Sequence, residues 1–113
     1  MNGPYSRLYD PKTVETIKGE VTNVESTAPM KGMSAGVHLT VKTDKGDAAV
    51  QLGPAWYLDN QEVQLAKGDR VEVRGSRVSL DGQKVIIAAD VKRGNDTLVL
   101  RDARGLPMWR GWR

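Results

Sequence analysis

Two methionines and the only histidine of this sequence stand close together and could bind a metal ion. Met30 and Met33 are three residues apart, and His38 follows five residues later. Thioether sulfurs and an imidazole nitrogen suit a soft ion such as Cu(I). Methionines in a long loop also fill gaps at the open end of a barrel, so packing is the alternative for the same residues. Copper at Met30, Met33 and His38 is therefore one hypothesis, and no other cofactor is indicated.

Basic side chains on neighbouring segments could bind single-stranded nucleic acid. Such binding needs a cationic groove and aromatic rings on which bases stack. His38 is the only ring between residues 36 and 54, and strand alternation points it outward. The alternative is a solvated strand face with ordinary lysines. The candidate nucleic-acid residues on these segments are Lys31, His38, Lys42, Lys45, Arg74 and Arg77.

The C-terminal tail is a second candidate for the same function. Trp109, Arg110 and Trp112 alternate rings with charge in the sequence WRGWR. Such a tail could stack on bases and pair with phosphate. It could equally fold back and bury both indoles against the body of the protein, because exposed tryptophans are unusual on a small soluble protein.

The composition disfavours several other classes of function. The 113 residues include no cysteine and one histidine, and no Ser/His/Asp grouping is evident, so we expect no enzyme. No apolar run approaches the length that spans a membrane. The formal net charge of +3 permits an anionic partner without requiring one.

Alternating apolar residues predict the strands that would position these side chains. The first strand begins near residue 13 and bends near residues 19–22, and a loop covers residues 25–35. Two strands follow, carrying Val37, Leu39 and Val41 and then residues 48–52. Gly53-Pro54 predicts one or two helical turns at residues 55–61, with Trp56 and also Tyr57 turned to the end of the barrel.

The longest predicted hairpin lies between residues 67 and 92. Gly75 interrupts its first strand, where a bulge or sharp bend is expected. Asp81-Gly82 predicts the tight turn, and residues 85–91 read as a largely buried strand. A short strand at residues 97–101 follows, with Leu98 and Leu100 on one face.

This order predicts an all-β fold with one short helix. We expect a five-stranded Greek-key barrel like the oligonucleotide/oligosaccharide-binding (OB) fold, with a small extra C-terminal strand. An SH3-like barrel and a small sandwich are the alternatives, and the helix after Pro54 favours the OB fold. Residues 1–12 are expected to form an arm that Tyr5, Leu8 and Tyr9 could pin down. Residues 13–101 would form the barrel and 102–113 a Trp/Arg tail.

Three segments resemble a group of small, usually exported bacterial OB-fold proteins that are labelled as DNA-binding or uncharacterised. They are residues 28–39 (APMKGMSAGVHL), 52–58 (LGPAWYL) and 100–109 (LRDARGLPMW). The resemblance implies the periplasm or cell envelope. No signal peptide is recognised in the sequence, and a cytoplasmic location stays open. It implies no catalytic residues.

The sequence therefore predicts a non-enzymatic OB-fold binding module whose first-named ligand is single-stranded nucleic acid. The alternative is a cell-envelope protein that binds copper or a protein partner through residues 30–38 and the tryptophan tail. No membrane insertion is expected, and the oligomeric state is left open.

Overall fold

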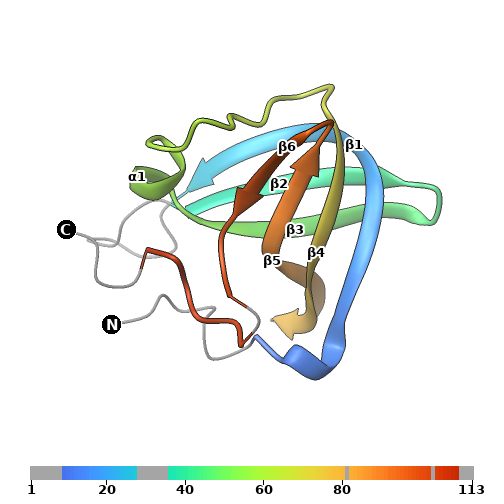
Figure 1. The fold of residues 1–113 in the computed structure, drawn as a ribbon. Helices are drawn as coiled ribbons and strands as arrows, with labels where there is room; N and C mark the ends of the chain where they lie inside the picture. Colours follow the sequence, from blue (N-terminus) through green and yellow to red (C-terminus); the bar gives the residue numbers. More distant parts are fainter. Residues whose placement is uncertain (1–8, 28–35, 81, 103, 110–113) are drawn as a thin grey trace.

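Six strands and one helical turn form the body of the molecule (Figure 1). The computed structural model describes residues 9–27, 36–80, 82–102 and 104–109 of the chain. A single 3₁₀ turn, Pro11–Thr13, precedes the first strand. The strands are β1 (Val14–Thr27), β2 (Gly36–Thr43), β3 (Gly46–Pro54), β4 (Arg70–Leu80), β5 (Gln83–Arg93) and β6 (Asp96–Val99), and α1 (Ala55–Leu58) follows β3.

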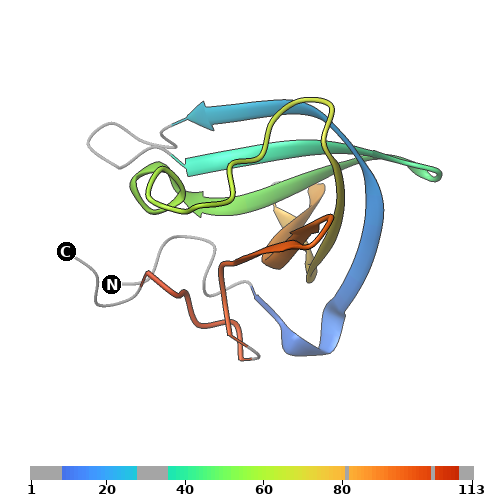
Figure 2. The same ribbon diagram turned by 45° about the horizontal axis from the view of Figure 1, so that its top comes forward.

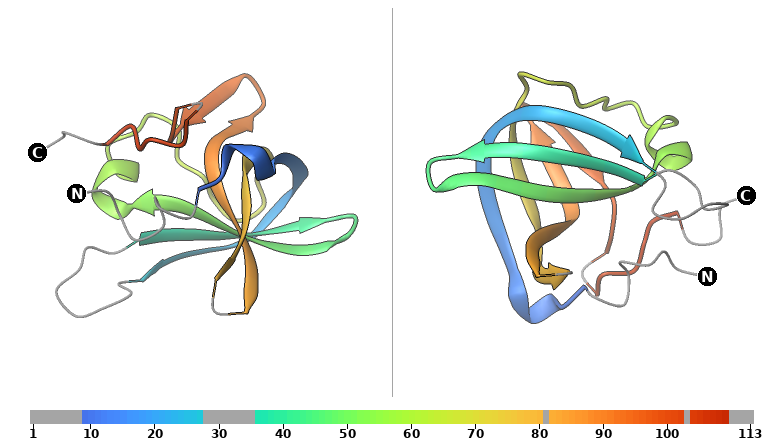
Figure 3. Two further views of the ribbon diagram at one scale, coloured as in Figure 1. Left: turned by 90° about the horizontal axis from the view of Figure 1, so that it is seen from below. Right: turned by 180° about the vertical axis from the view of Figure 1, so that it is seen from behind.

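The predicted barrel is confirmed. Antiparallel pairing runs in the order β3-β2-β1-β4-β5-β6, and a short parallel pairing between β3 and β5 closes the first five strands into a ring. β6 pairs with β5 outside that ring, as the extra C-terminal strand was expected to do. Figure 3 shows that the β2–β3 hairpin extends well past the rest of the barrel.

The expected bend in β1 is also confirmed, and it is what allows closure. β1 pairs with β4 as far as Glu20 and with β2 from Glu20 onward, with an irregularity between Val21 and Asn23. At the crossing, a Cβ on Gly19 would stand 2.2 Å from the carbonyl oxygen of Lys42, so only glycine fits. A similar break in β4, at Gly75, shifts the register against β5.

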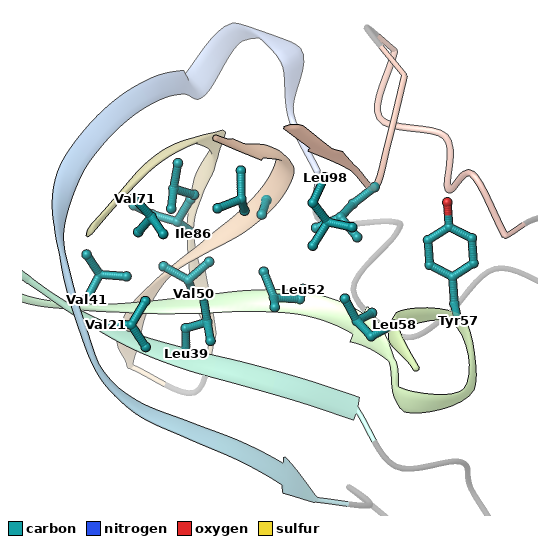
Figure 4. Packing of buried hydrophobic residues seen from close by; sticks show 14 of the residues in the cluster. Val21, Leu39, Val41, Val50, Leu52, Tyr57, Leu58, Val71, Ile86 and Leu98 are labelled. Carbon is teal, nitrogen blue, oxygen red and sulfur yellow. The ribbon is translucent and has the colours of Figure 1, made fainter. Parts of the chain in front are cut away.

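Valine, leucine and isoleucine fill the inside of the ring, as the absence of phenylalanine requires (Figure 4). A second, smaller cluster contains Tyr9, Ile87 and Ala89. Ile87 and Ala89 point to the opposite face of β5 from Ile86 and Ala88. Tyr9 therefore pins the N-terminal segment to the outer side of the wall. Tyr5 and Leu8 lie outside the described residues.

The helix lies where it was predicted, but only one of the two aromatic rings expected to face the end of the barrel does so. α1 is one turn long, and Tyr57 and Leu58 are its buried residues, whereas Trp56 is 39% exposed. The space expected for Trp56 is filled instead by Trp109 from the tail, whose ring packs 5.3 Å from that of Tyr57. Gly53 makes this possible, because a Cβ there would stand 2.7 Å from the indole.

Candidate functional site

A cleft of about 840 Å³ lies between β1 and the β2–β3 hairpin. Residues 15–19 of β1 form one wall, residues 42–48 of the hairpin form the other, and Arg70 and Arg77 of β4 complete the lining. We call this site the hairpin cleft. It exists because β1 pairs with β2 only from Glu20 onward, so the earlier part of β1 and the tip of the hairpin diverge (Figure 1).

Positive charge predominates in the hairpin cleft. Its basic residues come from three strands and the hairpin turn, and they outnumber its acidic residues by five to three. The basic residues are Lys18, Lys42, Lys45, Arg70 and Arg77, and the acidic residues are Glu15, Asp44 and Asp47.

One ion pair inside the cleft is bidentate. Arg77 donates from Nε and Nη2 to the two carboxylate oxygens of Glu15, at 2.8 and 2.7 Å. These bonds are the main reason that the pKa of Glu15 lies below its usual value, and the charges of Lys45 and Lys84 lower it further. Glu15 thus neutralises the charge of Arg77. The other basic side chains of the cleft remain able to bind other groups.

The other cations are more exposed. Lys18 lies 3.7 Å from Glu72 across the β1–β4 pairing. Among the described residues, Lys42, Lys45 and Arg70 have no carboxylate within salt-bridge distance, and all three side chains are exposed. A smaller adjoining hollow of about 290 Å³ shares Lys18 and Arg70 with the cleft and adds Glu72 and Lys92. Basic residues outnumber the acidic one there, so the positive surface continues from the cleft toward β5.

Three of the residues predicted from the sequence meet in this cleft, namely Lys42, Lys45 and Arg77. Arg74 lies on the outer face of β4 instead, where its Nε donates to Asp90 at 2.9 Å. His38 is half-buried on β2 opposite Glu25, away from the cleft lining, and burial lowers its pKa while the charge of Glu25 raises it. Met30, Lys31, Met33, Arg110 and Trp112 lie outside the described residues.

Trp109 is buried rather than presented to a ligand. It is 9% exposed, and the guanidinium carbon of Arg101 lies 5.1 Å from the centre of its ring. The same guanidinium lies 5.9 Å from the ring of Tyr9, and its Nη1 donates to the carbonyl of Gly105 at 3.0 Å. Burial lowers the pKa of Arg101 to about 10, so it stays charged at neutral pH. The described part of the tail therefore closes the barrel.

The sequence reasoning missed Glu15, Lys18 and Arg70 as residues of the cleft. Glu15 could have been found, because it shares the alternation of Ile17 and Gly19 on the inner side of β1. No pattern in the sequence marks Lys18 or Arg70, because they line the cleft only as a result of the way in which β1 crosses over β2.

Within the parts of the chain that the structure describes, no three His, Asp or Glu side chains gather in a way that could hold a metal ion. No described helix has the length and apolar character needed to cross a membrane.

A family model for the MamS/MamX magnetosome proteins matches residues 13–98. That match spans most of the chain and contains the whole ring, the hairpin cleft and α1. This chain belongs to the MamS/MamX magnetosome protein family. No curated protein matches it significantly.

Membership of the MamS/MamX family overturns two of the sequence-based expectations. The resemblance to DNA-binding OB-fold proteins was wrong, and the prediction of single-stranded nucleic-acid binding that rested on it was wrong too. The structure shows the physical reasons: β2 and β3 carry no aromatic platform, Arg74 and Arg77 are bound to carboxylates, and Trp109 is buried. The alternative, copper or a protein partner held by residues 30–38 and the tail, finds no support in the family either.

The expected cellular location is supported in part. A magnetosome family agrees with a bacterial protein connected with the cell envelope. The periplasmic location is finer than this and belongs to the proposal below.

Proposed function

We propose that this MamS/MamX-family barrel is a non-enzymatic module of the magnetosome system that binds a small, multiply charged anion in the hairpin cleft. We place it on the periplasmic side of the envelope. The observation that carries the proposal is the gathering of five basic side chains around one cleft of about 840 Å³.

The size and charge of the cleft together favour such a ligand. Small-molecule sites usually occupy about 300–1,000 Å³, and a cleft lined by one sign of charge concentrates the field within it. The cations come from three strands and the hairpin turn, so a ligand with two or more anionic groups could contact several of them at once. Lys42, Lys45 and Arg70 are the residues best placed to do so, because Arg77 is already held by Glu15.

We propose a non-enzymatic role because the shifted pKa values of the titratable groups have structural causes. Perturbed pKa values often mark catalytic groups. The lowered pKa of Glu15 follows from its bond to Arg77, and that of Asp69 from the backbone N–H of Ala66 and from Arg93. Both causes are structural ion pairs or hydrogen bonds. His38, the only histidine, does not line the cleft.

Carboxylate and phosphate groups share the chemistry that this cleft would recognise, and titration can separate them. We expect citrate or pyrophosphate to shift the backbone amide NMR signals of residues 15–19 and 42–48. Binding should weaken as salt rises, because exposed charges are screened. The anion that binds more tightly identifies the preferred group.

Matched variants test the site itself. Lys45→Gln combined with Arg70→Gln should weaken binding at least tenfold. Lys67→Gln combined with Arg104→Gln removes the same charge from exposed residues outside the cleft lining and should leave binding unchanged. The proposal fails if neither anion shifts the cleft amides, or if both pairs of substitutions weaken binding equally.

A further inference from the structure

A second feature, separate from the hairpin cleft, is a gap in the wall of the barrel beside the end of β1. β4 begins at Arg70 and accompanies β1 only as far as Glu20. Just beyond, the backbone of Val21 still exchanges two hydrogen bonds with the chain before β4: its N–H donates to Asp69 at 2.8 Å, and its carbonyl accepts from Gly68 at 2.7 Å. Among the described residues, no backbone hydrogen bond reaches this side of β1 after Val21.

The edge that remains is about six residues long, from Thr22 to Thr27. In a strand, alternate backbone N–H and C=O groups point to each side, and β2 satisfies only one side of this part of β1. At about 3.3 Å per residue the edge is roughly 20 Å long. An unpaired edge of this kind is a template for another extended chain.

A groove of about 240 Å³, lined by both apolar and polar residues, lies directly along this edge. β1 contributes Val24 to it, β2 contributes Val37, and the connector between α1 and β4 contributes Val63 and Leu65. This connector, residues 59–69, runs from α1 back to the start of β4 without regular structure (Figure 2). Val24 is 39% exposed although it faces the same way as buried Leu39, its partner on β2.

Charge at the rim indicates what kind of chain would fit. Glu25 and Asp59 are the charged residues that line the groove, and both are acidic and exposed. A segment that enters between them would gain from lysine or arginine at its ends.

We propose that this β1 edge groove binds an extended, basic peptide segment of another protein by strand addition. The backbone of the peptide would pair with residues 22–27, as in other complexes that extend a sheet at its edge. Every second side chain would be apolar and enter the groove beside Val24 and Leu65, and its basic residues would face Glu25 and Asp59. No residue of this groove lines the hairpin cleft, so this proposal does not rest on the anion proposal.

Selection from a library of random decapeptides displayed on phage, with the full chain as bait, tests the proposal. We expect enrichment of sequences that alternate apolar residues and carry lysine or arginine. A synthetic copy of an enriched sequence should shift the amide NMR signals of residues 22–27 and 63–65, and amide protons on the edge of β1 should become protected from exchange.

A pair of exposed valines supplies the matched control. Val24→Gln should weaken binding of the peptide at least tenfold without changing the charge of the groove. Val99→Gln should not weaken it, because Val99 is similarly exposed (44% against 39% for Val24) but lies on β6. Both valine variants should keep the melting temperature of the parent, and Asp59→Lys should weaken the binding of basic peptides. The proposal is overturned if no alternating sequence is enriched, or if Val24→Gln binds as well as the parent. Self-association of the chain that Val24→Gln abolishes would overturn it in favour of a second copy.

Discussion

Gly19 is the residue on which closure of the barrel depends most directly. A Cβ there would meet the carbonyl oxygen of Lys42 at 2.2 Å and a methyl group of Val41 at 2.9 Å. The first neighbour is backbone and cannot rotate away. We expect Gly19→Ala to lower the free energy of unfolding by about 2 kcal/mol or more, in the range of overpacked sites. Urea denaturation measures this.

Gly46, the first residue of β3, is the control for that substitution. Its φ of +119° favours glycine, but nothing lies within 4 Å of a Cβ there. Gly46→Ala therefore adds backbone strain alone, worth about 1 kcal/mol. A smaller loss for Gly19→Ala than for Gly46→Ala would contradict the close crossing of β1 over β2.

The two described tryptophans should differ sharply in their contribution to stability. Trp109 is buried against Tyr57 and over Gly53, so Trp109→Ala should cost about 3–5 kcal/mol. Trp56 is exposed, and Trp56→Ala should cost less than about 1 kcal/mol. Denaturation of the two variants tests this, and a reversed order would mean that the plug had been assigned to the wrong ring.

The same pair shows where prediction from sequence stopped at the residue scale. A helix of one turn contains too few residues for an apolar period, so nothing in residues 55–58 says which of two adjacent rings points inward. The orientation of the two rings depends on Trp109, which is distant in the sequence. Trp109 reaches the end of the barrel only because Gly53 has no side chain in its way. Contacts of that kind become visible only in three dimensions.

One carboxylate helps to hold the connector between α1 and β4. Asp69 accepts from the backbone N–H of Ala66 at 2.9 Å and from Arg93 at 3.0 Å, and these two bonds place its pKa below the usual value. The folded state therefore binds this proton more weakly than the unfolded state. Its contribution to stability is present at neutral pH and is lost as the pH falls below about 4.

Asp69→Asn should therefore lower the free energy of unfolding at pH 7. Below pH 4 the variant should lose less of its free energy of unfolding than the parent does. Denaturation at pH 7, 4 and 3 compares the variant with the parent. Asp47→Asn serves as the control, because Asp47 is exposed and has no ion pair among the described residues. Identical pH slopes for Asp69→Asn and the parent would refute this role of Asp69.

Strands and turns were the part of this fold that the sequence predicted best. Alternation placed β2 and β3, Asp81-Gly82 placed the β4–β5 turn, and Gly19 and Gly75 marked the two bends. The hairpin cleft itself was not predicted, although three of its residues, Lys42, Lys45 and Arg77, were named as candidates for a different ligand. Its remaining walls depend on the angle at which β1 leaves β2, and local patterns carry no information about that angle.

At the scale of the whole molecule, the first and last described segments meet. Tyr9 and Trp109 lie on the guanidinium of Arg101, and a Cβ on Gly105 would stand 2.2 Å from the ring of Tyr9. Nearby, the N–H of Asp10 donates to the buried hydroxyl of Ser76 at 3.0 Å. Segments at opposite ends of the sequence are thus tied to each other and to β4, so the barrel should not open at one end alone.

Because both rings lie on Arg101, we expect Tyr9 and Trp109 to be energetically coupled even without a contact between the two rings. Removing either ring loosens Arg101, so the second removal should cost less than it does alone. In a double-mutant cycle of Tyr9→Ala and Trp109→Ala, we expect an interaction of at least about 0.5 kcal/mol, because both residues share one partner. The control cycle pairs Tyr9→Ala with Val24→Ala, which lies in a separate groove and should be additive. Additivity in both cycles would show that the two segments are held independently, and Arg101 would then not be the link between them.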